Sequence, residues 1–187
     1  MRITKKWLIE KYACEPGLLW FCNQSEINPI KIIKKLMLED RYEWGSWLIT
    51  NILTKKDNIL YAIFAAEKVL HIFEEKYPND KRPRKAIEVA KKYLSNFYAS
   101  AAADAAAAAA VDASDAAYID DATAAADAAA AAYSTAAAVT SDYITSSVYA
   151  DSAYADSASA AAYNNNSDYY LEKKIINYGI DLLKKQE

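Results

Sequence analysis

The chain has 187 residues, of which 53% are hydrophobic, 12% aromatic and 25% charged, and its formal net charge is −3 at pH 7. This length is enough to bury a core in one or two domains, and three Gly and four Pro are too few for the many turns of a sheet protein. Two Cys and one His argue against a disulfide scaffold and against a set of soft or nitrogen metal ligands. We therefore predict an all-α protein with no cofactor and no metal site.

The first segment, residues 1–98, has the pattern of an amphipathic helical bundle. Apolar residues at Trp7, Leu8 and Tyr12 predict a short first amphipathic helix. Pro16 and Gly17 follow closely, and this pair predicts that the helix ends before them.

Two capping signals mark later helices of the bundle. Asn28 precedes Pro29, a residue type that favours the first turn of a helix. Thr54 and Asp57 resemble a capping box, which opens a long helix that closes at Tyr77 and is predicted to form the centre of the core. The residues expected to face the core are Ile30, Ile33, Leu36, Met37, Ile59, Ile63, Ala66, Leu70 and Phe73.

The remaining chain is divided by composition into residues 99–163 and 164–187. About half of the first segment is Ala, and Leu, Met, Phe, Trp, Gly, Pro, Lys and Arg are absent from it. Because Ala is the best helix former, this Ala/Tyr/Asp-rich region is predicted to form two or three antiparallel helices rather than coil. The second segment predicts a C-terminal helix that packs back on the bundle through Leu171, Ile175, Tyr178 and Leu182. We expect one continuous domain.

Charge is distributed unevenly along the chain. No Lys or Arg occurs between Lys92 and Lys173, and ten Asp fall in residues 93–171. Because the whole chain carries −3, the rest of it carries a formal +7. This asymmetry indicates that the basic part meets an anionic ligand, or that it binds the acidic part of its own chain or of a second copy. Flat alanine faces also let helices approach closely, so we expect a homo-oligomer.

The sequence also limits where the protein acts. No run of about 18 large apolar residues is present, and the N-terminus lacks the apolar region of a secretory signal. We expect a cytoplasmic protein that binds no membrane. The long acidic region would repel a duplex, so DNA is not an expected partner.

The most distinctive candidate site is a basic cluster formed by Lys81, Arg82, Arg84 and Lys85 at the predicted start of a helix. Free backbone N–H groups and the positive end of the helix dipole favour anions at such a position. Each guanidinium can bind a phosphate or carboxylate with two hydrogen bonds, and Tyr77 or Tyr93 can stack on a base. Alternatively, the segment is a rigid turn whose cations bind the acidic helices or lie in water.

Trp44 and Trp47 are predicted to lie beside the basic cluster and to complete a pocket between helix ends. Such a pocket would sequester an anionic nucleotide signal. Neither a nucleophile beside a base nor a glycine-rich phosphate loop is visible, so we expect a protein that is not an enzyme. The single His71 is interpreted as a core or boundary residue.

The segment FEEKYPNDKRPRKAIEVAKKYL, with the Ala-rich helices punctuated by Tyr and Asp that follow it, resembles the immunity protein family of bacterial toxin systems and related uncharacterised phage proteins. The resemblance runs from about Trp7 into the alanine region and is best from Asp80 to Ile87. It implies a role in phage or bacterial conflict, as anti-defence or immunity, carried out by stoichiometric binding without catalytic residues. Besides nucleotide sequestration, it leaves open an immunity or inhibitor protein that covers a toxin with its acidic alanine helices.

A third possibility is a structural or ice-binding protein. The segment DATAAADAAAAA looks like the alanine-rich helical antifreeze peptides. Polar residues recur here every eleven positions, which keeps them on one face of a slightly unwound helix. These residues are Asp112, Thr123, Ser134, Thr145, Asp156 and Ser167.

Overall fold

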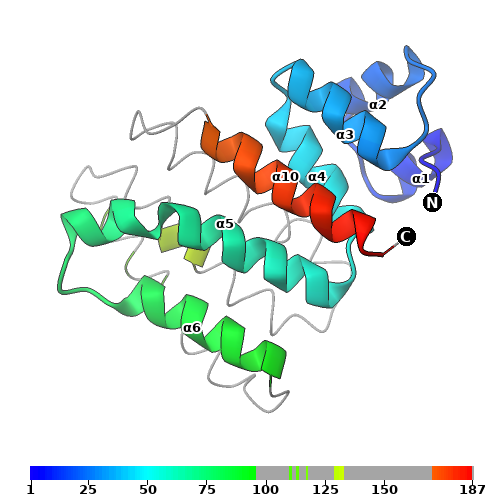
Figure 1. The fold of residues 1–187 in the computed structure, drawn as a ribbon. Coiled ribbons are helices and arrows are strands. Elements are labelled where there is room, and N and C mark those ends of the chain that lie inside the picture. The colour runs from blue at the N-terminus through cyan, green and yellow to red at the C-terminus, as the bar shows by residue number, and fades with distance from the viewer. Residues whose placement is uncertain (96–109, 111–112, 114–116, 118–128, 133–169, 187) are drawn as a thin grey trace.

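The computed structural model describes residues 1–95, 110, 113, 117, 129–132 and 170–186. These residues contain helices and no strand, so the all-α prediction is confirmed. None of the described helices combines the length and the apolar character needed to cross a bilayer. The helices are α1 (Lys5–Glu10), α2 (Glu15–Cys22), α3 (Pro29–Leu38), α4 (Tyr42–Ile52), α5 (Lys55–Lys76), α6 (Arg82–Ser95) and α10 (Tyr170–Lys184) (Figure 1).

The long helix α5 is the centre of the described fold, as predicted. It begins where the Oγ1 of Thr54 accepts a hydrogen bond of 3.2 Å from the backbone N–H of Asp57, which confirms Thr54 as the cap. It lies between α6 and α10 (Figure 1) and packs on both. Its buried face includes all the predicted core positions of this helix, which are Ile59, Ile63, Ala66, Leu70 and Phe73.

Helix α10 returns from the C-terminal segment to pack on α4 and α5, which confirms the predicted packing. The helices approach each other closely at Gly179, where an added Cβ would lie 2.8 Å from two side-chain carbons of Ile49 and 2.9 Å from the ring of Tyr61. Beside it, the buried hydroxyls of Ser46 and Tyr61 share a hydrogen bond of 3.3 Å between α4 and α5. Glycine is therefore required at this crossing because the neighbouring helices leave no room for a methyl group.

Several alanines of the predicted Ala-rich region belong to the same buried cluster as the residues of α5. The described members are Ala110, Ala113, Ala117, Ala129, Ala131 and Ala132. The expected segment boundaries at 98/99 and 163/164 and the residues of the eleven-residue recurrence lie outside the described residues.

The first helix ends before Pro16 and Gly17, as expected, but this pair does not terminate it. The placement of Tyr12 on that helix is wrong, because Tyr12 lies beyond its end and is exposed. Helix α1 already ends at Glu10, and Pro16 lies in the first turn of α2. A proline is accommodated there because the first N–H groups of a helix have no intrahelical acceptor. The segment after the first helix is therefore a second helix, which turns back to pack on α1.

Two Schellman motifs, each without glycine, terminate α1 and α3. After α1, the N–H of Tyr12 donates to Ile9 O at 3.0 Å and the N–H of Ala13 donates to Leu8 O at 2.9 Å. After α3, Asp40 occupies the position equivalent to Tyr12. Both residues have a positive φ, 59° at Tyr12 and 54° at Asp40, in the left-handed region that glycine adopts most easily.

Replacing Tyr12 by glycine is expected to raise the free energy of unfolding by about 1 kcal/mol, because a side chain in the left-handed conformation is strained. Little packing would be lost, since Tyr12 is 75% exposed. Tyr12→Ala removes the ring but keeps the strain, so it is expected to leave stability nearly unchanged. Urea unfolding of both variants separates the two effects. Equal stabilisation by alanine and glycine would contradict this account.

Candidate functional site

The first part of the basic cluster is anchored by Asp80, which lies in the turn before α6. The guanidinium of Arg82 donates from Nε to Asp80 Oδ1 at 3.0 Å and from Nη2 to Oδ2 at 2.6 Å. The backbone N–H of Arg82 also donates to Asp80 Oδ1 at 3.0 Å. These hydrogen bonds lower the pKa of the Asp80 carboxyl below its ordinary value. The Asp80 carboxylate thus accepts hydrogen bonds both from a backbone N–H in the first turn of α6 and from the guanidinium of Arg82.

The second anchor is Glu74, in the last turns of α5. The Nε of Arg84 donates to Glu74 Oε1 at 2.6 Å, and its Nη2 pairs with Oε2 of the same carboxylate. Lys81 Nζ lies 3.6 Å from Oε1. The side chain of Glu74 is only 19% exposed, and the hydrogen bond from Arg84 lowers the pKa of Glu74. Three of the four cations of this cluster, Lys81, Arg82 and Arg84, therefore pair with carboxylates of α5 and of the preceding turn.

Replacing Glu74 by glutamine is expected to lower the free energy of unfolding by about 1 kcal/mol at pH 7, near the upper end for surface ion pairs because the geometry is bidentate. The pKa of Glu74 is lowered in the folded state, so its contribution is present above the unfolded pKa and is lost as the pH falls through the folded pKa. At pH 7 wild type and E74Q should differ in urea unfolding, and at about pH 3 the difference in the free energy of unfolding should be smaller. E10Q, in the exposed pair with Lys6, is the control with little effect expected at either pH. A deficit of E74Q that persists undiminished at the lower pH would contradict the ion-pair account.

Tyr77 and Lys85 are the remaining predicted residues of this region. Tyr77 ends α5 and packs its ring against Phe73, with the centroids 5.0 Å apart. Lys85 is exposed and forms no ion pair with the described residues. Tyr77 therefore lies near the turn that carries the basic cluster, and its ring packs against the core.

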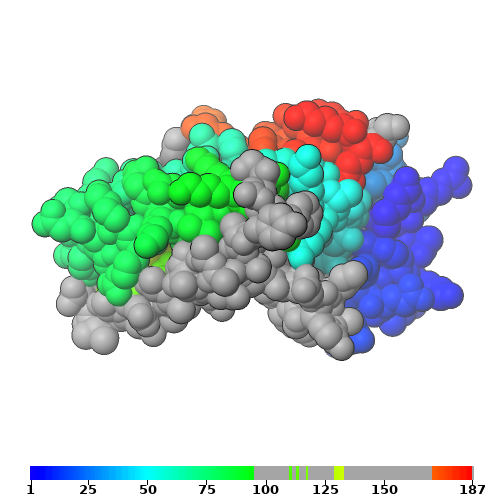
Figure 2. All heavy atoms as spheres, turned by 90° about the horizontal axis from the view of Figure 1, so that it is seen from below, coloured from blue at the N-terminus to red at the C-terminus, as the bar shows by residue number. Residues whose placement is uncertain are grey.

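Trp44 and Trp47 lie on α4, away from the basic cluster. Both line a pocket of about 300 Å³ formed by the N-terminal residues, hereafter the N-terminal pocket. Helix α5 is 22 residues long, roughly 33 Å at 1.5 Å per residue, and it separates α4 from the start of α6 (Figure 1). Figure 2 likewise shows α1 and α2 at one end of the molecule and α6 toward the other. The expected single pocket, which joins the tryptophans to the basic cluster, is thus not formed by the described residues.

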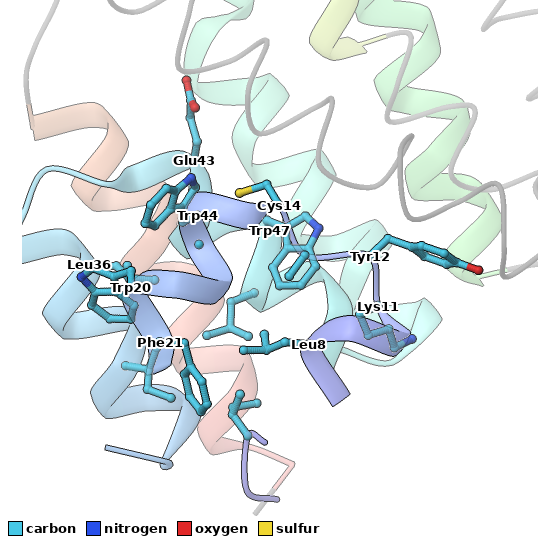
Figure 3. Close-up of a pocket in the computed structure, with 15 residues that line it drawn as sticks. Leu8, Lys11, Tyr12, Cys14, Trp20, Phe21, Leu36, Glu43, Trp44 and Trp47 are labelled. Carbon is cyan, nitrogen blue, oxygen red and sulfur yellow. The ribbon is translucent and has the colours of Figure 1, made fainter. Parts of the chain in front are cut away.

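The N-terminal pocket has walls that sequence reasoning missed. Trp20 and Phe21 come from α2, and Leu8 and Leu36 come from α1 and α3 (Figure 3). The only signal was the run LLWFC, which has large rings but no clear helical period. The residues that line the N-terminal pocket are Ile3, Leu8, Lys11, Tyr12, Ala13, Cys14, Gly17, Trp20, Phe21, Ile32, Leu36, Glu43, Trp44, Trp47 and Leu48.

Other candidate chemistry is limited within the part of the chain that the structure describes. No group of three or more His, Cys, Asp or Glu side chains is placed to hold a metal ion there. Cys14 and Cys22 are free and exposed. His71 is exposed on α5, so its interpretation as a core or boundary residue is wrong.

The described helices thus define an all-α protein that carries a self-paired basic cluster and a separate aromatic pocket. A family model described as Imm-5 like putative immunity protein matches residues 49–174, which is more than half of the chain. The chain belongs to this family, so the family resemblance noted from the sequence is confirmed. No curated protein and no solved structure gives a significant match to the chain.

Proposed function

We propose that this protein is an immunity protein that binds a protein toxin stoichiometrically and holds it inactive, without catalysing a reaction. The observation that carries the proposal is the match of the Imm-5 like family model to residues 49–174. The basic cluster supports a protein partner over a small anion because three of its four cations already pair with carboxylates of the chain.

Co-expression with a panel of bacterial toxin domains tests this function. The chain is expected to restore growth against a particular toxin and to co-purify with it. Growth rescue with no complex between the two purified proteins would contradict the proposal, and so would failure to rescue growth against any toxin of a broad panel.

Sequestration of an anionic nucleotide stays a prediction. One observation favours it, since Trp44 and Trp47 line the same pocket and offer rings on which a base can stack. Yet Lys11 is the only cation among the described residues that line it. Native mass spectrometry of freshly purified protein tests the prediction through any retained mass, and the same spectrum reports the expected homo-oligomer. An ice-binding role predicts thermal hysteresis.

A further inference from the structure

The N-terminal pocket lies outside the region that the family model matches. All its lining residues fall between residues 3 and 48, whereas the match begins at residue 49. The long helix α5 and its partner α6 lie within the matched region. The N-terminal pocket is therefore formed by residues of this chain that the family model does not match.

The aromatic walls of the pocket are held in place from outside. Trp20 and Trp44 meet edge to face, with centroids 6.4 Å apart. Trp20 Nε1 donates to Glu39 at 2.6 Å, and the Arg41 guanidinium, which also bonds Glu39, lies 4.4 Å from the ring centre of Trp44. Because these contacts fix the rings before anything binds, the pocket is pre-organised, and little ordering entropy would oppose binding.

The charged groups of the pocket lie at its rim. Lys11 and Glu43 are the only charged residues among the described lining residues, and neither forms an ion pair within the described chain. In Figure 3 the carboxylate of Glu43 extends away from the cluster of rings. Burial, together with the charges of Glu43 and Asp40, raises the pKa of Glu172. Glu43 therefore has the acidic residue Glu172 nearby.

This distribution of polar groups decides the kind of occupant. Sites for small polar ligands direct several polar groups inward to orient the ligand. Protein interfaces instead combine an apolar pocket for one large side chain with a polar rim. The N-terminal pocket has the second arrangement, since its interior is apolar and aromatic and its rim carries one cation and one anion.

The rim also carries an exposed aromatic residue in a strained conformation. Tyr12 lines the pocket, is 75% exposed and has φ of 59°. Its ring points away from the other rings (Figure 3). Strained residues that gain no burial in return are concentrated at functional sites, and an exposed tyrosine is a frequent anchor at protein interfaces.

We propose that the N-terminal pocket receives a bulky apolar or aromatic side chain of the protein partner, flanked by an acidic residue that pairs with Lys11 and a basic residue that pairs with Glu43. Tyr12 packs against the partner beside this anchor. The proposal rests on the proposed function for the identity of the partner, while the pocket itself can be tested without any toxin.

The probe is the capped peptide acetyl-Glu-Phe-Lys-amide, titrated into the full-length protein and followed by the indole N–H signals of the tryptophans. We expect saturable binding with Kd of about 1 to 10 mM, since one side chain supplies few contacts. Replacing Phe by Ala in the peptide should weaken binding about tenfold, and the neutral acetyl-Gln-Phe-Gln-amide should bind about threefold more weakly at low salt.

The two free cysteines provide a test position and its matched control. Cys14 lines the pocket, whereas Cys22, also free and exposed, does not. Alkylation of Cys14 with N-ethylmaleimide in the folded C22S variant should fill the pocket and weaken peptide binding at least about tenfold. Alkylation of Cys22 in C14S should leave binding unchanged.

Three results would overturn the pocket proposal. These are no saturable binding up to about 20 mM peptide, equal binding after alkylation at either cysteine, and binding of free toluene as tight as that of the peptide, which would indicate a small apolar ligand. Peptide binding without toxin neutralisation would reject the proposed function alone, and neutralisation without peptide binding would reject the pocket proposal alone.

Discussion

Replacing Gly179 by alanine is expected to destabilise the protein by about 1 to 3 kcal/mol, because the new methyl group overpacks the crossing of α10 with α4 and α5. The added Cβ would lie 2.8 Å from carbons of Ile49 and 2.9 Å from the Tyr61 ring. The gain in helix propensity, about 1 kcal/mol, offsets only part of this cost. Thermal unfolding should show a midpoint lower by about 2 to 12 °C for a chain of this size.

Gly45→Ala is the matched control, since Gly45 is also buried in a helix of the same core. A Cβ at Gly45 would lie 3.5 Å from Ile176 and 3.9 Å from Ile33, which is ordinary contact. This variant should gain about 0.5 to 1 kcal/mol from propensity. Equal changes in the two variants would show that local helix propensity, and not close packing of α10, decides stability at Gly179.

Replacing Asn58 by aspartate is expected to cost about 3 kcal/mol or more at pH 7, because it places a charge in the core beside a carbonyl oxygen. The Asn58 side chain is buried, and its Nδ2 donates to Thr50 O at 2.8 Å, which satisfies a carbonyl in the last turn of α4. A carboxylate cannot donate this hydrogen bond, whereas a protonated carboxyl can.

The pH dependence of this effect has a definite sign. Burial should raise the pKa of the carboxyl group introduced in N58D above its unfolded value, so its penalty is smallest below about pH 4 and grows as the pH rises. N58A loses the donor without adding a titrating group and serves as the reference at each pH. A constant difference between N58D and N58A from about pH 3 to pH 7 would contradict a buried carboxylate.

The helices of the bundle were largely predictable because their start signals are local. Asn28 accepts the hydrogen bond from Lys31 N at 3.0 Å, as a cap must, and the stripe of α5 has the expected helical period. The end of α1 was not predictable, because its left-handed residue is Tyr12 where glycine is usual. The role of Pro16 was predicted wrongly because a proline can either follow the end of one helix or lie in the first turn of the next.

The candidate site was predicted only in part. The sequence indicated correctly that Arg82 and Arg84 lie at the start of a helix. The pairing of Arg84 with Glu74 depends on the turn between α5 and α6, which brings together residues ten positions apart. The N-terminal pocket depends on how four short helices pack, and no local pattern shows that Trp20 meets Trp44.

The most direct test of stoichiometric neutralisation is a titration of toxin activity with this protein, using the toxin domain identified by growth rescue. The account predicts that activity falls linearly to zero at a fixed small ratio of the two chains, is independent of incubation time after mixing, and returns when the complex is dissociated. Inactivation by far less than one chain per toxin, increasing with time and persisting after separation, would show turnover and contradict the account.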